Sequence, residues 1–294
     1  MVGPTAQGGG AAASLTDPGS PTTTRVSVSS SGDQIGAPSF DSDISAQGRY
    51  VVFSSDTSRL VAGDTNNARD VFVRDRRTHL TRRVSVTTNG AQSNNDSSQP
   101  SISADGRYIA FIAEASNLVD GDASQRLDVF VRDRVAKVTR RVSVATGGQG
   151  GNGPSYDPVI SADGRYVAFN SDASNLVDGD TNGVTDVFVR DLERNVTRRL
   201  SVGAGGAQAH GSSVHPAISA DGQYVAFQSP ASNLVAGDTN AKPNVFVRDR
   251  VAKVTCECRS AQAASRATVL AVSRYLGGRP LRRIWLGRLE PGGR

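Results

Sequence analysis

Short apolar runs separated by polar turns recur along most of the chain, and their residues favour strands over helices. In one such stretch, residues 158–161 are short and apolar, and residues 165–169 are rich in aromatic and β-branched side chains. The Ala-Asp-Gly between them contains residues that tolerate a tight hairpin. Two more apolar runs, 186–190 and 197–202, follow after a loop. This pattern predicts four short antiparallel strands.

The same pattern returns every 58 residues without a gap. The run Asp-Val-Phe-Val-Arg-Asp starts at Asp70, Asp128 and Asp186, and a copy that begins with Asn starts at Asn244. Runs such as Val-Phe-Val are apolar on both faces, as expected for sheets covered on both sides. A fixed period indicates an array whose units bury their faces against each other. Eight of the nine Phe occupy two fixed places in the unit: Phe53, Phe111, Phe169 and Phe227, then Phe72, Phe130, Phe188 and Phe246.

These observations predict an all-β fold, a β-propeller of four four-stranded antiparallel blades that forms a partial or small propeller. The repeat region spans residues 24–255, with units at about 29–86, 87–144, 145–202 and 203–255, after a disordered segment 1–23. The alternative is a β-solenoid or an extended string of small sheets, but solenoid coils usually have shorter periods and no hairpin in each unit. Residues 24–28 resemble a fourth strand, which could complete the last blade and close the ring.

The repeated motifs resemble those of the TolB-like, WD-repeat-like bacterial propellers. The elements concerned are Ser-Ala-Asp-Gly-Arg-Tyr-Val-Ala-Phe, Asp-Val-Phe-Val-Arg-Asp and Thr-Arg-Arg-Val-Ser-Val, in that order. The resemblance implies a propeller of usually six or more blades that lies in the periplasm or outside the cell and often binds proteins. The 58-residue unit is longer than the family's norm, and four blades are fewer than usual.

Charge and cysteine are concentrated at the C-terminal end. The net charge is +5, and residues 256–294 hold eight Arg and two Glu, a balance of +6, which leaves −1 for the rest. A nearly neutral repeat region argues against a nucleic-acid partner. The only cysteines are Cys256 and Cys258, so the repeats carry no disulfide framework. No apolar run is long enough to span a membrane, and the first residues do not form a signal peptide as written.

The repeat stops after Thr255, where Cys-Glu-Cys replaces the Arg-Arg-Val that was due. Codons for residues 275–285 can be read one nucleotide later as Ile-Ser-Ala-Asp-Gly-Arg-Tyr-Val-Ala-Phe, the hairpin of the next unit. We therefore interpret residues 256–294 as a basic tail produced by a frameshift within a fifth unit. The alternative is an authentic basic tail that binds a membrane or nucleic acid.

The loop between the second and third strands contains the one candidate metal site. In the third unit Asp178, Asp180, Asn182 and Asp186 place oxygen atoms at positions 1, 3, 5 and 9, and Gly183 supplies the bend. Ca²⁺ requires such oxygen ligands, and the spacing resembles the calcium loops of integrin-type propellers. The alternative is a turn whose Asp and Asn side chains bond the local backbone.

The other copies of this loop are weaker candidates. The second unit has Gln125 at the bend, and its candidate ligands are Asp120, Asp122 and Asp128. Ca²⁺ is the only cofactor that the sequence suggests.

The sequence contains no recognisable catalytic motif. Neither Gly-x-Ser-x-Gly, a P-loop nor His-Glu-x-x-His occurs, and we expect that the chain is not an enzyme. His79, His210 and His215 are interpreted as surface residues. The Arg-Asp pairs that end the third strands, such as Arg74 and Asp75, are interpreted as solvated strand ends or ion pairs between blades.

The function expected from the sequence is a propeller scaffold that binds a protein or polysaccharide partner. The alternatives are a calcium-stabilised structural or adhesive module and a propeller that acts on carbohydrates.

Overall fold

The computed structural model describes residues 23–122, 124–240 and 242–257. Apart from one short 3₁₀ turn, η1 (Ala204–Gly206), the regular elements of these residues are β-strands. The strands are β1 (Ser39–Ile44), β2 (Tyr50–Ser55), β3 (Asp70–Asp75), β4 (Leu80–Arg83), β5 (Ser97–Ile102), β6 (Tyr108–Ala113), β7 (Asp128–Asp133), β8 (Val138–Arg141), β9 (Ser155–Ile160), β10 (Tyr166–Ser171), β11 (Asp186–Asp191), β12 (Val196–Arg199), β13 (Val214–Ile218), β14 (Tyr224–Ser229), β15 (Asn244–Asp249) and β16 (Val254–Glu257).

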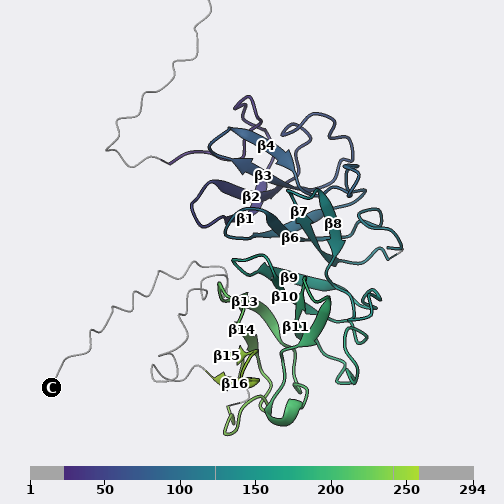
Figure 1. Cartoon of the computed structure of the whole chain (residues 1–294), viewed down its shortest axis with the longest axis vertical. Helices are drawn as coiled ribbons and strands as arrows, with labels where there is room; N and C mark the ends of the chain where they lie inside the picture. The colour runs from purple at the N-terminus through teal and green to yellow at the C-terminus, as the bar shows by residue number, and fades with distance from the viewer. Residues whose placement is uncertain (1–22, 123, 241, 258–294) are drawn as a thin grey trace, which may run out of the picture.

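Each unit forms one four-stranded antiparallel sheet with its strands in chain order. The first sheet is β1-β2-β3-β4, and the second, third and fourth follow in the same way. Figure 1 shows the four sheets one after another along a curved path, with β1–β4 and β13–β16 at its two ends. The prediction of an all-β chain with four four-stranded blades is confirmed, and the described residues form a partial propeller.

The fourth strands end earlier than the sequence predicted, and a serine is the reason. In the third unit the strand was predicted over residues 197–202, whereas β12 ends at Arg199. Two residues later the Ser201 hydroxyl accepts the Val187 N–H at 3.1 Å and itself donates to Asp186. A side chain therefore satisfies the backbone donor that a longer strand would have used, and the chain leaves the sheet.

The core lies between the sheets. At the interface of the first two sheets, Val52 and Val73 pack in one buried cluster with Ile102, Phe111 and Phe130. Clusters of the same kind join the second sheet to the third and the third to the fourth. We call each such interface a seam. Because each sheet is thin and twisted, its buried faces need these neighbours for stability.

A glycine and a tyrosine meet at every seam. Gly164 lies in the hairpin between β9 and β10 at φ +75°, and a Cβ atom there would lie 2.2 Å from Cδ2 of Tyr108 in the second sheet. Gly106 and Gly222 approach Tyr50 and Tyr166 equally closely. Both the backbone angle and the close approach exclude a side chain at these positions.

Backbone hydrogen bonds also cross the seams. The Ala46 N–H donates to the Ala104 carbonyl, Ala104 to Ala162, and Ala162 to Ala220, at 3.0–3.1 Å. These bonds link equivalent hairpins and fix the register of one sheet on the next.

The predicted closing strand at residues 24–28 is wrong. The fourth sheet obtains its outer strand, β16, from its own unit, where Val254 pairs with Asp249. Residues 24–28 form no strand, and Val28 makes only an isolated bridge with Gln34. Within the described residues, extensive contact between sheets links only successive sheets.

The interpretation of residues 256–294 lies outside the described residues except at its start. Cys256 and Glu257 extend β16 and pair with Val247 and Phe246. The predicted disorder of residues 1–23 likewise falls almost wholly outside the described part. The unit boundaries near residues 29, 87, 145 and 203 remain a prediction, and each observed sheet lies within one unit except for the last two residues of β16.

Candidate functional site

An arginine lies at the centre of the predicted calcium loop in the third unit. Arg199 on β12 places Nη1 3.0 Å from Asp180 Oδ1 and 3.3 Å from Asp186 Oδ2. The Asn182 side-chain amide donates to Asp186 Oδ2 at 3.0 Å. The structure therefore brings Asp180, Asn182 and Asp186 together, whereas Asp178 is exposed at the start of the loop.

The loops of the first two units have the same arrangement. Arg141 contacts Asp122 at 3.2 Å and Asp128 at 2.7 Å, and Asp120 is exposed. In the first unit Arg83 contacts Asp64 at 3.1 Å. Burial raises the pKa of Asp128 above its ordinary value, against the lowering effects of the Ser143 hydroxyl and of Arg141.

In these loops a guanidinium supplies the positive charge that buried carboxylates require. No group of three or more His, Cys, Asp or Glu side chains in the described part of the chain is arranged to hold a metal. The calcium loop remains a proposal, and any cation there would compete with an arginine for the same oxygen atoms.

The fourth unit departs from this pattern. The register of β15 and β16 pairs Glu257 with Phe246, as Arg199 pairs with Phe188. An acidic residue therefore occupies the arginine position. Asn244 also replaces the aspartate at the start of the third strand, and its side-chain amide donates to Asp238 at 3.1 Å. The substitution of Asn for Asp leaves one carboxylate fewer in this loop.

A second polar array runs along the first strands of the sheets. Asp41, Gln99, Asp157 and His215 occupy one position of the repeat, and each has a positive φ of 48° to 53°. The Asp157 N–H donates to Gln99 Oε1 at 3.0 Å, and His215 Nδ1 lies 3.2 Å from Asp157 Oδ2. Non-glycine residues in this conformation are strained, so the neighbouring structure must hold them there.

His215 was placed wrongly from the sequence. It lies on β13 and occupies a repeated position, whereas it was assigned to a variable loop. His79 also occupies a repeated position, at positive φ in the hairpin that precedes β4. The 58-residue spacing from Asp157 to His215 was the signal that could have placed His215 correctly.

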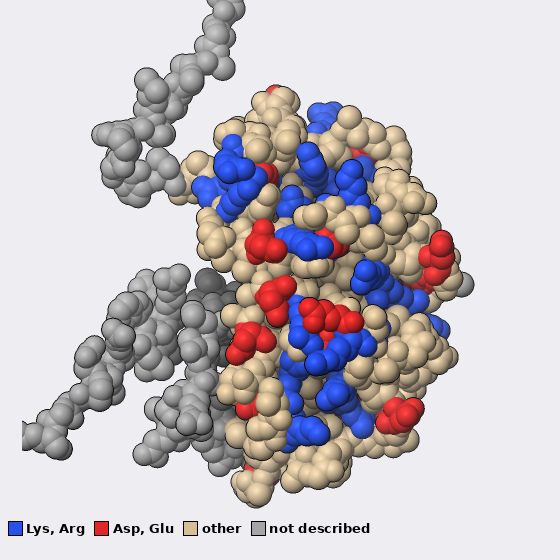
Figure 2. All heavy atoms as spheres, in the orientation of Figure 1, with Lys and Arg blue, Asp and Glu red and all other residues tan. Residues whose placement is uncertain are grey.

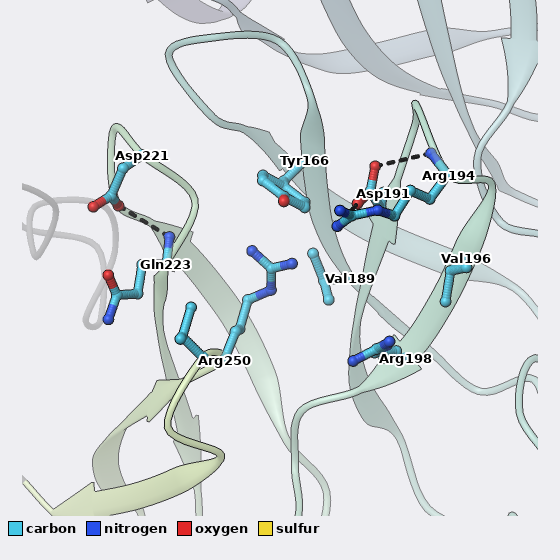
Figure 3. A pocket seen from close by; sticks show the side chains of 10 residues that line it. Tyr166, Val189, Asp191, Arg194, Val196, Arg198, Asp221, Gln223 and Arg250 are labelled. Atoms are coloured by element: carbon cyan, nitrogen blue, oxygen red, sulfur yellow. Dashed lines mark hydrogen bonds and ion pairs between the residues drawn. The ribbon is translucent and has the colours of Figure 1, made fainter.

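A groove of about 320 Å³ opens at the seam between the third and fourth sheets. We call it the arginine groove and define it by Tyr166, Arg194, Arg198 and Arg250, which line it. Figure 3 shows Arg250 reaching from the fourth sheet toward Tyr166 and Val189 of the third. Its guanidinium carbon lies 3.9 Å from the centre of the Tyr166 ring. This stacking holds a cation in a fixed position at the mouth of the seam.

The side chains of the three arginines of the groove differ in the groups that they contact. Arg194 is exposed and lies 3.7 Å from Asp191, which also binds Arg165 at 2.9 Å. Arg250 donates to the Gly222 carbonyl. The Arg198 side chain is exposed on β12, and its guanidinium makes no hydrogen bond or ion pair with the described residues. Its charge is therefore available to a ligand.

Asp191 stays ionised beside this groove. Burial alone would raise its pKa, but the Arg165 guanidinium and the backbone N–H groups of Glu193 and Arg194 outweigh burial and lower it. Asp75 and Asp133 bind Arg49 and Arg107 in the same way within their own sheets. These aspartates form ion pairs within their own sheets. The interpretation of them as solvated strand ends or as partners in ion pairs between blades was therefore wrong.

Figure 2 shows basic and acidic side chains gathered along one face of the array, with basic ones prominent over the third sheet. A smaller groove of about 190 Å³ at the first seam is lined by the equivalent residues Tyr50, Arg82 and Arg134. At the middle seam the position of Arg134 and Arg250 is occupied by Leu192. The seam between the third and fourth sheets therefore has the larger and more basic groove.

No protein-family model matches the chain, and no curated protein matches it. Solved structures resemble its fold. TolB from Acinetobacter baumannii is 16% identical, with a TM-score of 0.44 over 75% of this chain and 43% of that protein. A TolB structure from Agrobacterium tumefaciens is 15% identical, with a TM-score of 0.46 over 74% of this chain and 63% of that protein. The chain spans less than two thirds of either. The resemblance to TolB-like propellers is confirmed at the level of fold.

The expectation that the chain is not an enzyme is corrected. The similar structures include the tricorn protease, 13% identical with a TM-score of 0.45 over 74% of this chain and 22% of that protein. Dipeptidyl peptidase 4 from Porphyromonas gingivalis is another, 14% identical over 74% of this chain and 32% of that protein with a TM-score of 0.45. These similar structures include peptidases as well as TolB, so the fold alone does not decide whether this chain is an enzyme.

Among the described residues, the structure contains no helix with the length and apolar character needed to cross a membrane.

Proposed function

We propose that the chain is a binding module that holds a carboxylate-bearing segment of a protein or polysaccharide partner in the arginine groove. The observation that carries the proposal is the exposed Arg198 guanidinium, which no described residue neutralises, beside Arg250 stacked on Tyr166. Guanidinium groups bind carboxylates through paired hydrogen bonds, and the aromatic ring adds an apolar contact surface. The groove volume of about 320 Å³ is sufficient for one or two residues of a polymer.

The surroundings of the groove restrict the ligand. Asp191 and Asp221 line its rim, and the pKa of each lies below its ordinary value. For Asp221 the Ser219 hydroxyl is the main cause. These fixed negative charges disfavour a ligand of uniformly high negative charge, such as a nucleic acid. An isolated carboxylate, placed between the arginines and away from the rim, satisfies both sets of charges.

The experiment measures binding of two labelled probes to the full chain by fluorescence anisotropy: a hexapeptide with one glutamate among neutral polar residues, and a neutral sugar oligomer with one galacturonate. The variant Arg198→Glu reverses the free charge and is expected to weaken binding about tenfold or more, the effect of losing a charge-assisted contact. The control Arg140→Glu changes the equivalent exposed residue of the second unit, where Leu192 replaces the stacked arginine. It is expected to change binding less than about twofold.

Both probes carry a carboxylate but differ in their backbone. Tighter binding of one of them therefore shows whether the groove prefers a peptide or a polysaccharide. Equal losses in the two variants would contradict a site at the arginine groove. The absence of binding by either probe at millimolar concentration would contradict the proposal as a whole.

We also propose a location in the periplasm or outside the cell. The support is the resemblance of the repeated motifs to those of envelope propellers. Digestion of intact producing cells with an added protease, before and after the outer membrane is opened, tests it. Protection in both conditions would contradict the proposal.

A further inference from the structure

The two ends of the array carry the two halves of a seam that the chain builds three times internally. At each internal seam, the earlier sheet presents a tyrosine and two or three valines, and the later sheet covers them with an isoleucine and a glycine hairpin. The fourth sheet has no later sheet to cover it, and the first sheet has no earlier sheet to cover, within the described residues.

Exposure shows that the first sheet lacks a partner. Ile44 is 54% exposed, whereas Ile102 and Ile160, at the same position of the repeat, are each 7% exposed. An isoleucine at this exposure presents an apolar surface that water covers at a free-energy cost.

The fourth sheet shows the complementary deficit. Val187 and Val189 of the third sheet are 0% and 2% exposed. Their equivalents, Val245 and Val247, are only partly buried. The same face of the third sheet is covered by the fourth sheet.

Backbone groups match across the two ends as well. The Ala220 N–H and the Ala46 carbonyl have no partner in a neighbouring sheet of the described chain, although they are the donor and acceptor types that pair at each internal seam. Ser213 N–H donates to the Thr185 carbonyl at the third seam, and the corresponding groups at the ends are Ser39 N–H and the Pro243 carbonyl. Unpaired edge groups of this kind are templates for association.

Arg76 in the first sheet and Tyr224 in the fourth sheet are the two halves of a contact that occurs at two internal seams. Arg134 and Arg250 each bond the carbonyl of their hairpin glycine and stack on the tyrosine of the previous sheet. Arg76 in the first sheet donates to the Gly48 carbonyl at 2.8 Å in the same way but has no tyrosine beside it. Tyr224 of another copy would supply that ring.

We propose that the first sheet of one copy of this chain docks on the fourth sheet of a second copy through a fourth seam of the same geometry. The contact is head-to-tail, so it either closes two copies into a ring or continues into a longer assembly. A second copy satisfies all of these half-seam groups at once, because it carries the matching half in the register that the chain already uses internally. This proposal is independent of the arginine groove, which lies at an internal seam.

The test is sedimentation velocity of the full chain from about 1 to 200 μM, a range that brackets micromolar association. The wild-type mass is expected to rise with concentration toward twice the monomer mass or beyond. Ile44→Glu places a charge on an exposed surface and leaves the internal seams intact. It is expected to remain monomeric with an unchanged melting temperature. Val247→Glu alters the opposite half-seam and is also expected to remain monomeric. The control Val135→Glu, 71% exposed at a hairpin in the second unit, is expected to associate like the wild type.

Mixing the two monomeric variants gives the decisive result. Ile44→Glu retains an intact fourth sheet and Val247→Glu retains an intact first sheet, so an equimolar mixture is expected to form a heterodimer through one intact seam. A wild-type chain that stays monomeric throughout the concentration range would overturn the proposal. Association of Ile44→Glu alone, or no complex in the mixture, would overturn it as well.

Discussion

Substitution of Gly164 by alanine tests how closely the second and third sheets pack. Two separate effects disfavour a side chain at this position: the positive φ and the close approach of Tyr108. At φ +75° an alanine is strained, which costs about 1–2 kcal/mol, less a few tenths regained from the unfolded chain. Its Cβ would also lie 2.2 Å from Tyr108 Cδ2, more than 1 Å inside contact distance. Forcing a methyl group into a packed seam costs about 1–3 kcal/mol. The sum predicts a loss of about 2–4 kcal/mol in the free energy of unfolding.

Gly48 supplies the matched control. It has φ +68° in the equivalent hairpin of the first sheet, where the nearest atom to a new Cβ is 3.4 Å away, on the flexible Arg76 side chain. Gly48→Ala therefore keeps the backbone strain and removes the clash, and a loss of about 1 kcal/mol is expected. Urea unfolding followed by circular dichroism measures both variants.

A double-mutant cycle assigns the remaining difference to the seam. In a Tyr108→Ala background, Gly164→Ala should lose only about as much as Gly48→Ala, because the ring that blocks the methyl group is gone. If Gly164→Ala and Gly48→Ala lose equal stability in the wild-type background, the close packing of the second and third sheets is refuted.

Three further predictions concern the charged groups of the sheets. Glu257→Arg restores the guanidinium that the first three units place in their acidic loops. It should raise the melting temperature by a few degrees, whereas Cys256→Arg, at the exposed neighbouring position, should not; equal effects would contradict the role of the buried arginine. Arg199→Gln leaves two buried carboxylates without their cation. Millimolar Ca²⁺ should raise the melting temperature of this variant more than that of the wild type, and a larger response in the wild type would favour calcium over the guanidinium as the native partner. Hydrogen bonding from Arg49 holds the pKa of Asp75 below its ordinary value. An unfolded aspartate takes up its proton near pH 4, so stability due to this pair is present above about pH 4 and is lost as pH falls. Asp75→Asn should therefore be less stable at pH 7 and lose less stability between pH 5 and pH 3, and an unchanged slope in urea unfolding would contradict the assignment.

The fold could be predicted from the sequence because the same 58-residue pattern of apolar runs and turns occurs four times. The apolar runs around Phe169 and Phe188 had to pack against a sheet on each side, and the Ala-Asp-Gly turn at Gly164 had to reverse the chain. What the period could not show was the direction of each side chain out of its strand. Arg199 follows Asp180 by 19 residues, on the far side of another strand, and only the folded sheet brings them within 3.0 Å.

The candidate sites were harder to predict for a related reason. The array of Asp41, Gln99, Asp157 and His215 is constant in position but variable in residue type, so comparison by residue identity overlooked it. The arginine groove combines residues of two units, and its character depends on Arg250 standing where the third unit has Leu192. A pattern within one unit does not predict a cavity that two units form together.

Hydrogen exchange at four equivalent alanine amides tests most directly the claim that the described sheets stack on one another in chain order. The N–H groups of Ala46, Ala104 and Ala162 donate across seams, whereas that of Ala220 has no acceptor among the described residues. In dilute, monomeric protein the first three should exchange slowly and Ala220 quickly, because only bonded amides are protected. Rapid exchange at Ala104 and Ala162 would contradict the stacking, and slow exchange at Ala220 in the monomer would show that it has an acceptor beyond the described residues.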